Sequence, residues 1–245
     1  MSGFCHLFLL TVTISALMVN CQKPSSENDI IRILLTNYND PYTPDVKPVN
    51  VGIETFILSN PVLLNRGTSG EPMLEIDNMW IIQRWRDRRL NFETFYPERN
   101  NIRLPHEHIS KVWTPQISSI NDKKFEIRRS PTPNIYLFIF ENGTVNLSFR
   151  AAVQLPCRTD CQENEIRCRL TFESGNYNIE QVRLNWANDQ LFVDAGGDQY
   201  DQTQKWSVNR TVLSKETNEF SLGKYDYLEA TFVLKPNLKR CEIEL

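Results

Sequence analysis

Two runs of β-forming residues joined by an Asn-Gly turn constrain the fold of this chain more than any other feature. Ile135–Phe140 and 145–153 are rich in Val, Ile, Phe, Leu and Tyr, and residues 141–144, Glu-Asn-Gly-Thr, separate them. Asn-Gly is typical of the tight turn between antiparallel strands, because glycine readily adopts the positive φ values that such a turn needs. The pattern therefore predicts a β-hairpin over residues 135–153.

Further short runs of the same kind follow one another along the chain. They lie at 51–58, 74–84, 110–113, 166–173, 181–186, 206–213 and 227–234. Upstream of them, Ser26 with Asp29 three residues later and apolar residues at 30, 31, 34 and 35 predict one capped amphipathic α-helix. Short strands at this spacing are typical of a sandwich. We therefore expect an all-β fold, a two-sheet immunoglobulin-like β-sandwich of about ten strands with one N-terminal α-helix.

The N-terminal 21 residues have the pattern of a secretory signal peptide. Residues 7–19 form an apolar run that is too short to span a bilayer, and Val19 and Cys21 are small enough for cleavage before residue 22. An uncleaved N-terminal anchor is the alternative. After residue 21 no apolar run approaches the roughly 18 residues of a transmembrane helix. We therefore expect a secreted, extracellular mature chain, residues 22–245, that forms one domain without a membrane span.

Cysteines and glycosylation sequons agree with export. The four cysteines outside the expected signal peptide are Cys157, Cys161, Cys168 and Cys241. An even number in an oxidising compartment predicts two disulfides, and four cysteines allow three pairings. Their spacing lacks the paired C-x2-C of a zinc site, so we expect no metal there. The three N-glycosylation sequons begin at Asn142, Asn146 and Asn209.

Charge and motifs argue against a nucleic-acid partner and against catalysis. A net charge of −3 provides no clustered basic surface for nucleic acid or an anionic membrane. His106 and His108 would point to one side of a strand and could bind a metal, but no third ligand lies near them in the sequence. No nucleophile motif is present, so we expect neither a catalytic residue nor a cofactor. A glycosidase-type pair of distant carboxylates stays open on spacing alone.

Several motifs occur in an order that resembles one family. They are Trp85-Arg-Asp-Arg-Arg-Leu90, Trp113-Thr-Pro, Asn121-Asp-Lys123, the Asn-Gly-Thr hairpin and a cysteine-bounded loop. The chain resembles, over about residues 27–240, the extracellular ligand-binding domain of the Cys-loop (pentameric neurotransmitter-gated) ion channels. It looks closest to the anion-selective branch of GABA-, glycine- and glutamate-gated channels. The resemblance implies a homo- or hetero-pentamer with related subunits, which binds a small neurotransmitter-like ligand between neighbours.

The resemblance also implies which residues bind that ligand. Family members attract an ammonium group with a box of aromatic rings between two subunits. The positions kept here are Glu173, Tyr177, Phe220 and Tyr225 on the principal face, and Trp80 and Ser148 on the complementary face. Alternatively, the loop aromatics cover the sandwich edge and Trp80 is a subunit contact.

Several positions of the box depart from the family pattern. Gln116 and Ser118 replace an acid and an aromatic after Trp-x-Pro, and Gly175 replaces another aromatic. Ile82 stands where several family members place an arginine for the transmitter carboxylate. A buried carboxylate without a partner is costly, so the resemblance favours simple amines over amino acids.

The cysteine loop also departs from the family. The resemblance implies the pairs Cys157–Cys168 and Cys161–Cys241, and the first encloses ten residues, fewer than in the family. The aromatic-proline tip through which the family loop contacts its membrane domain is absent. We therefore expect a soluble binding module that lacks the pore. The alternatives are a truncated or incomplete channel subunit, and an extracellular interaction protein that no longer binds transmitter.

Overall fold

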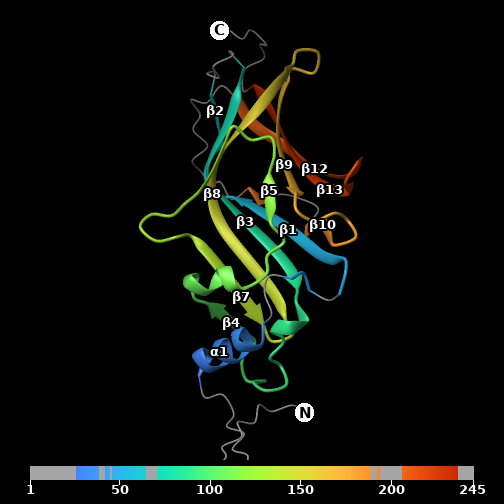
Figure 1. Cartoon of the computed structure of the whole chain (residues 1–245). Helices are drawn as coiled ribbons and strands as arrows, with labels where there is room; N and C mark the ends of the chain where they lie inside the picture. The colour runs from blue at the N-terminus through green and yellow to red at the C-terminus, as the bar shows by residue number, and fades with distance from the viewer. Residues whose placement is uncertain are drawn as a thin grey trace, which may run out of the picture.

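A computed structural model describes residues 26–38, 42–44, 46–64, 71–188, 192–193 and 206–236. Within them lie one α-helix, two short 3₁₀ helices and thirteen strands (Figure 1). The helices are α1 (Glu27–Asn37), η1 (Arg88–Leu90) and η2 (His106–Lys111). The strands are β1 (Val49–Ile57), β2 (Val62–Leu64), β3 (Met73–Arg86), β4 (Asn101–Leu104), β5 (Ile117–Ser119), β6 (Lys124–Ile127), β7 (Ile135–Phe140), β8 (Thr144–Asp160), β9 (Glu165–Ser174), β10 (Val182–Trp186), β11 (Phe192–Val193), β12 (Trp206–Phe220) and β13 (Gly223–Pro236). The expected signal peptide and Cys241 lie outside the described residues.

The helix has the cap that the sequence predicts. Ser26 accepts a hydrogen bond from the Asp29 backbone N–H at 3.2 Å, and its hydroxyl donates to the Asp29 carboxylate at 2.9 Å. Ile30 and Leu34, one turn apart on one helical face, are buried. The helix therefore covers one end of the sandwich, as Figure 1 shows.

The long strand β8 joins the two layers of the sandwich. Strands follow the order β10-β1-β3-β8-β9-β13-β12, and the shorter strands pair onto this path. Residues 144–156 of β8 pair with β3, whereas residues 157–160 pair with β9. One strand of 17 residues thus passes from one layer to the other. The all-β sandwich is confirmed, and the three strands beyond the expected ten, β2, β5 and β11, have only two or three residues.

Alternating side chains of β3 and β8 fill the space between the layers. Ile81 pairs with Phe149 and Trp85 pairs with Val145, and all four side chains are buried. Because successive side chains of a strand point to opposite faces, the neighbours of these residues lie on the outer face of the same layer. The inner face of this layer is therefore mostly apolar and buried, and Trp80, the neighbour of Ile81, lies on the outer face.

The β7–β8 hairpin confirms the strongest prediction from the sequence. Gly143 has a φ of +81°, and a Cβ atom there would lie 2.5 Å from the backbone oxygen of Asp87. The side-chain oxygen of Asn142 accepts a hydrogen bond from the Thr144 backbone N–H at 2.9 Å. Glycine is required both by its φ angle and by the close approach of the β3–η1 turn.

The prediction of a strand at 110–113 is wrong. This segment belongs to and follows the 3₁₀ helix η2, in which the His108 N–H donates to the Pro105 carbonyl at 2.9 Å. A 3₁₀ helix has three residues per turn, so side chains two residues apart do not share a face. His106 and His108 therefore do not point to one side, as they would on a strand. The described residues contain no group of three side chains suited to a metal ion. In the same part of the chain, no helix has the length and apolar character needed to cross a bilayer.

Candidate functional site

The structure divides the predicted ligand-binding residues between two surfaces. Glu173, Tyr177, Phe220 and Tyr225 lie on β9, on the connection after it and on the β12–β13 hairpin. Trp80 and Ser148 lie on β3 and β8, which do not pair with β12 or β13. We refer to these two sets as the principal group and the complementary group.

Three aromatic rings meet at the end of the β12–β13 hairpin. The ring centroids of Phe220 and Tyr225 are 6.1 Å apart, and those of Phe220 and Tyr227 are 6.4 Å apart. Tyr225 and Tyr227 project from the same face of β13 because they are two residues apart. The sequence predicts a strand at Tyr227 but not a place for it in the site; the alternation Tyr-Asp-Tyr at 225–227 is the signal that identifies it.

Glu173 lies beside this aromatic cluster. It is directly opposite Tyr227 of β13 on one side and Ser118 of β5 on the other. Burial raises the pKa of Tyr227 to about 12, and the hydrogen bond between its hydroxyl and the Glu173 carboxylate adds to this rise. A half-buried carboxylate beside aromatic faces is a chemical arrangement suited to a cationic amine.

The pKa of Tyr227 leads to a prediction for alkaline stability. Because its folded pKa exceeds the ordinary value of 10, the stability that it contributes is complete below pH 10 and is lost as the pH rises to about 12. We expect Tyr227→Phe to remove this part of the loss, measured by urea unfolding between pH 9 and 12. Tyr136→Phe, at a half-buried tyrosine of β7 outside this cluster, is the control. Equal pH slopes for the wild type and Tyr227→Phe would contradict the assignment.

Tyr177 is held by Trp113 and by the hairpin. The indole N–H of Trp113 donates to the Tyr177 hydroxyl at 3.0 Å, and their ring centroids are 5.6 Å apart. The same connection is tied to β13, because the Ile179 N–H donates to the Lys224 carbonyl at 2.8 Å. Tyr177 therefore lies in a connection that touches both the sandwich core and the aromatic hairpin.

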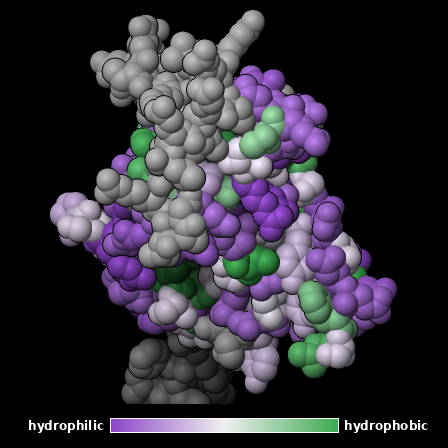
Figure 2. Space-filling model, turned by 90° about the horizontal axis from the view of Figure 1, so that it is seen from above, coloured by the Kyte–Doolittle hydropathy of each residue, from purple (hydrophilic) through white to green (hydrophobic). Residues whose placement is uncertain are grey.

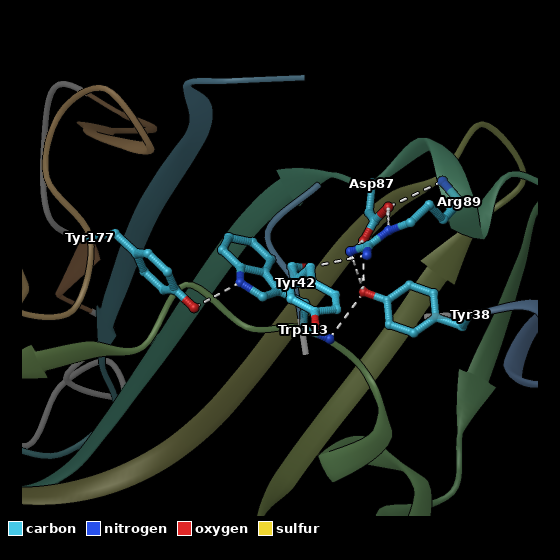
Figure 3. Close-up of polar contacts among 6 residues, drawn as sticks. All are labelled: Tyr38, Tyr42, Asp87, Arg89, Trp113 and Tyr177. Atoms are coloured by element: carbon cyan, nitrogen blue, oxygen red, sulfur yellow. Dashed lines mark hydrogen bonds and ion pairs between the residues drawn. The ribbon is translucent and has the colours of Figure 1, made fainter. Parts of the chain in front are cut away.

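A buried polar network extends from Trp113 to the turn after β3 (Figure 3). The Tyr38 hydroxyl donates a hydrogen bond to the Asp87 carboxylate at 2.7 Å. It accepts hydrogen bonds from the backbone N–H of Trp113 at 3.0 Å and from the Arg89 guanidinium at 2.8 Å. Arg89 and Asp87 form an ion pair at 2.7 Å, with Asp87 fully buried. Burial and the Asp87 carboxylate raise the pKa of Tyr38 far above its ordinary value. The Trp-Arg-Asp-Arg-Arg-Leu motif is thus connected to Tyr177 through a continuous chain of side-chain and backbone contacts.

The complementary group lies on the outer face of β3 and β8. Trp80 is half-buried, with its ring centroid 5.5 Å from that of Phe56. Ser148 pairs with Ile82 of β3 and Tyr136 of β7, and its side chain is buried. This face presents the Trp80 and Phe56 rings beside the exposed guanidinium of Arg150, which lies directly opposite Trp80.

The cysteine loop is closed by the first of the two expected disulfides. Cys157 and Cys168 lie directly opposite each other in β8 and β9 and form a disulfide. Cys161 is exposed in the turn between the two strands. Its pairing with Cys241 stays a prediction, since Cys241 is outside the described residues.

The three sequons lie in different settings. Asn142 is exposed in the hairpin turn, and Asn209 is exposed at a β-bulge of β12 where it has no cross-strand partner in register. Asn146 is half-buried in β8, between Arg84 and Phe138 of the neighbouring strands. Glycosylation of these residues stays a prediction.

Comparison with known proteins adds independent information. A family model described as the neurotransmitter-gated ion-channel ligand binding domain matches residues 27–238. An acetylcholine-gated chloride channel subunit (acc-2) of Caenorhabditis elegans is 32% identical over 174 residues, which cover 69% of this chain and 37% of the relative. The serotonin-gated chloride channel mod-1 of the same organism is 29% identical over 215 residues, 86% of this chain and 42% of the relative.

A human relative is more distant. The gamma-aminobutyric acid receptor subunit alpha-2 is 26% identical over 238 residues, 94% of this chain and 51% of that subunit. The chain therefore spans between about a third and a half of the length of the curated relatives it matches.

Proposed function

Because the chain belongs to the family of neurotransmitter-gated ion-channel ligand-binding domains, we propose that it binds a small amine between two neighbouring subunits. The observation that supports this most strongly is the Glu173 carboxylate beside the rings of Phe220, Tyr225 and Tyr227. A cation over an aromatic face gains about 0.5–2 kcal/mol, depending on how far it is desolvated. A carboxylate beside it adds a charge-assisted hydrogen bond.

Two further observations favour an amine over an amino acid. The relatives that are gated by acetylcholine and serotonin, both ligands with a cationic nitrogen and no carboxylate, are more similar to this chain than the gamma-aminobutyric acid receptor subunit. Ile82 is 7% exposed and offers no charge to a transmitter carboxylate. Arg150, exposed opposite Trp80, does offer a guanidinium, so amino acids are the competing ligand class in any test.

Glu173→Gln tests the role of the carboxylate. Loss of a charge-assisted hydrogen bond costs about 1.5–3 kcal/mol, so we expect serotonin, whose ammonium group can donate such a bond, to bind about 10- to 100-fold more weakly. Titration calorimetry on purified protein gives the dissociation constants. Glu126→Gln, at an exposed glutamate of β6, is the matched control and should change affinity less than twofold. Equal affinity of the wild type and Glu173→Gln would remove the carboxylate from the site.

Mixing subunits tests whether the site lies between two chains. If Glu173 and Trp80 belong to opposite sides of one interface, Glu173→Gln and Trp80→Ala subunits each bind the amine only weakly when expressed alone. In randomly mixed assemblies about a quarter of the interfaces then combine an intact principal side with an intact complementary side. Recovery of about that fraction of wild-type binding supports the interface. No recovery in assemblies shown to be mixed would contradict it.

The expectation of a soluble binding module stays a prediction, and the β8–β9 turn supports it. Cys161, Gln162 and Glu163 in this turn are exposed, and the turn presents no aromatic-proline tip. Seen from above, the described residues at this end of the molecule are mostly hydrophilic (Figure 2). Expression of the chain with its native N-terminus, followed by comparison of medium and membrane fractions, tests the prediction. Recovery from the membrane fraction only would contradict it.

A further inference from the structure

A cavity of about 1100 Å³, partly open to solvent, lies between the two layers and borders the proposed amine site at Tyr177. Gln83 and Leu147 line it from β3 and β8, where they pair in register. Because side chains alternate along a strand, these two residues point to the core side, opposite to Trp80 and Ser148. Of the predicted site residues, only Tyr177 lines the cavity.

The walls of this cavity are mostly apolar. The main apolar lining residues are Trp113, Phe125, Ile127, Phe149 and Phe172. Three charged side chains also line it: Glu107 and Arg129 are exposed to solvent, and Asp122 is half-buried. Burying a charge without a partner is costly, so this lining selects against a charged ligand.

Gln83 and Ser119 are two of the neutral polar side chains that line the cavity. The Ser119 hydroxyl oxygen is buried without a hydrogen-bond partner, and Gln83 is only 4% exposed. Buried polar atoms in proteins are normally hydrogen-bonded, so an orphaned hydroxyl in a cavity wall is a ready partner for a ligand group. The Gln83 amide can donate and accept, which suits a carbonyl or hydroxyl.

We propose that this cavity is a second ligand site, contained within one chain, for an uncharged molecule with a ring-shaped apolar body and one hydrogen-bonding group. Its volume matches sites that enclose drug-sized ligands, which occupy roughly 300–1,000 Å³. The ligand would lie against the inner face of the Trp113–Tyr177 pair, whereas the amine binds outside the layer.

Nile red, an uncharged dye with an apolar ring system and a carbonyl acceptor, is a suitable probe. We expect saturable binding of one dye per chain, seen as a blue-shifted rise in fluorescence. Leu147→Phe extends a side chain into the cavity and should weaken binding at least tenfold. Leu213→Phe is the matched control, because Leu213 packs against the core from β12 but does not line the cavity. The control should stay within twofold of the wild type, and equal effects of the two variants would overturn the proposal.

Photolabelling of the wild-type protein avoids any question of misfolded variants. The uncharged probe 3-phenyl-3-(trifluoromethyl)diazirine, activated by light, should label peptides that contain 125–127 or 147–149. Excess Nile red should suppress this labelling, whereas acetylcholine should not. Labelling confined to the β12–β13 hairpin, or labelling that no competitor suppresses, would overturn the proposal.

Discussion

Replacing Asp87 with Asn is expected to lower the free energy of unfolding by about 3–5 kcal/mol. Asp87 is fully buried and accepts hydrogen bonds from the Arg89 guanidinium, the Arg89 backbone N–H and the Tyr38 hydroxyl. Loss of one partner of a buried ion pair leaves the other charge uncompensated, which is the reason for the size of the effect. Urea unfolding followed by tryptophan fluorescence measures it, and Trp113 reports on the same network.

The matched control for Asp87→Asn is Asp77→Asn. Asp77 lies on the same strand but is exposed, so its replacement should change stability by less than about 0.5 kcal/mol. Since Trp113 links this network to Tyr177, we also expect Asp87→Asn to weaken amine binding. A loss of stability below about 1 kcal/mol for Asp87→Asn would show that the network does not hold this end of the sandwich.

Removal of the Cys157–Cys168 disulfide by the double substitution Cys157→Ala, Cys168→Ala is expected to cost about 3 kcal/mol. The bond closes a short loop across β8 and β9, and closing a loop of this size restricts the unfolded chain by about that amount. Both cysteines are buried, so alanine leaves no unsatisfied polar group in their place. Differential scanning calorimetry of the two proteins measures the difference.

A reductant provides the second arm of the disulfide experiment. Once the bond is opened by thiol reduction, the wild type should fall to a melting temperature near that of the double variant, whereas the variant should change little. Arg158→Ala, one residue along β8 and exposed, controls for disturbance of the hairpin and should leave stability nearly unchanged. A double variant as stable as the oxidised wild type would contradict a stabilising role for this bond.

The elements that sequence predicted well have local causes. The α1 cap depends on Ser26 and Asp29, and the β7–β8 turn depends on Gly143, whose backbone angles only glycine adopts without strain. The ion pair of Asp87 and Arg89 is likewise local, because the two residues lie two positions apart in one motif. In each of these cases the interacting groups are close in the sequence.

The features that sequence missed depend on distant residues. Segment 110–113 is rich enough in apolar residues to resemble a strand, yet it continues from a 3₁₀ turn begun at Pro105. Strand β5 exists only because it pairs with β9, more than fifty residues later. Tyr227 joins the site through Glu173 on another strand, and the 1100 Å³ cavity is made by side chains from several elements. No local pattern records such pairings.

A ligand panel followed by thermal shift tests the central claim most directly. Acetylcholine, serotonin, gamma-aminobutyric acid and glycine are each added to the purified protein and to Glu173→Gln at increasing concentration. A ligand at 100 times its dissociation constant adds about 2.7 kcal/mol to stability, enough for a clear rise in melting temperature. We predict a rise with acetylcholine or serotonin that is reduced in Glu173→Gln, and none with the two amino acids. No rise with either amine, or a rise with the amino acids alone, would contradict the proposal of an amine-binding domain.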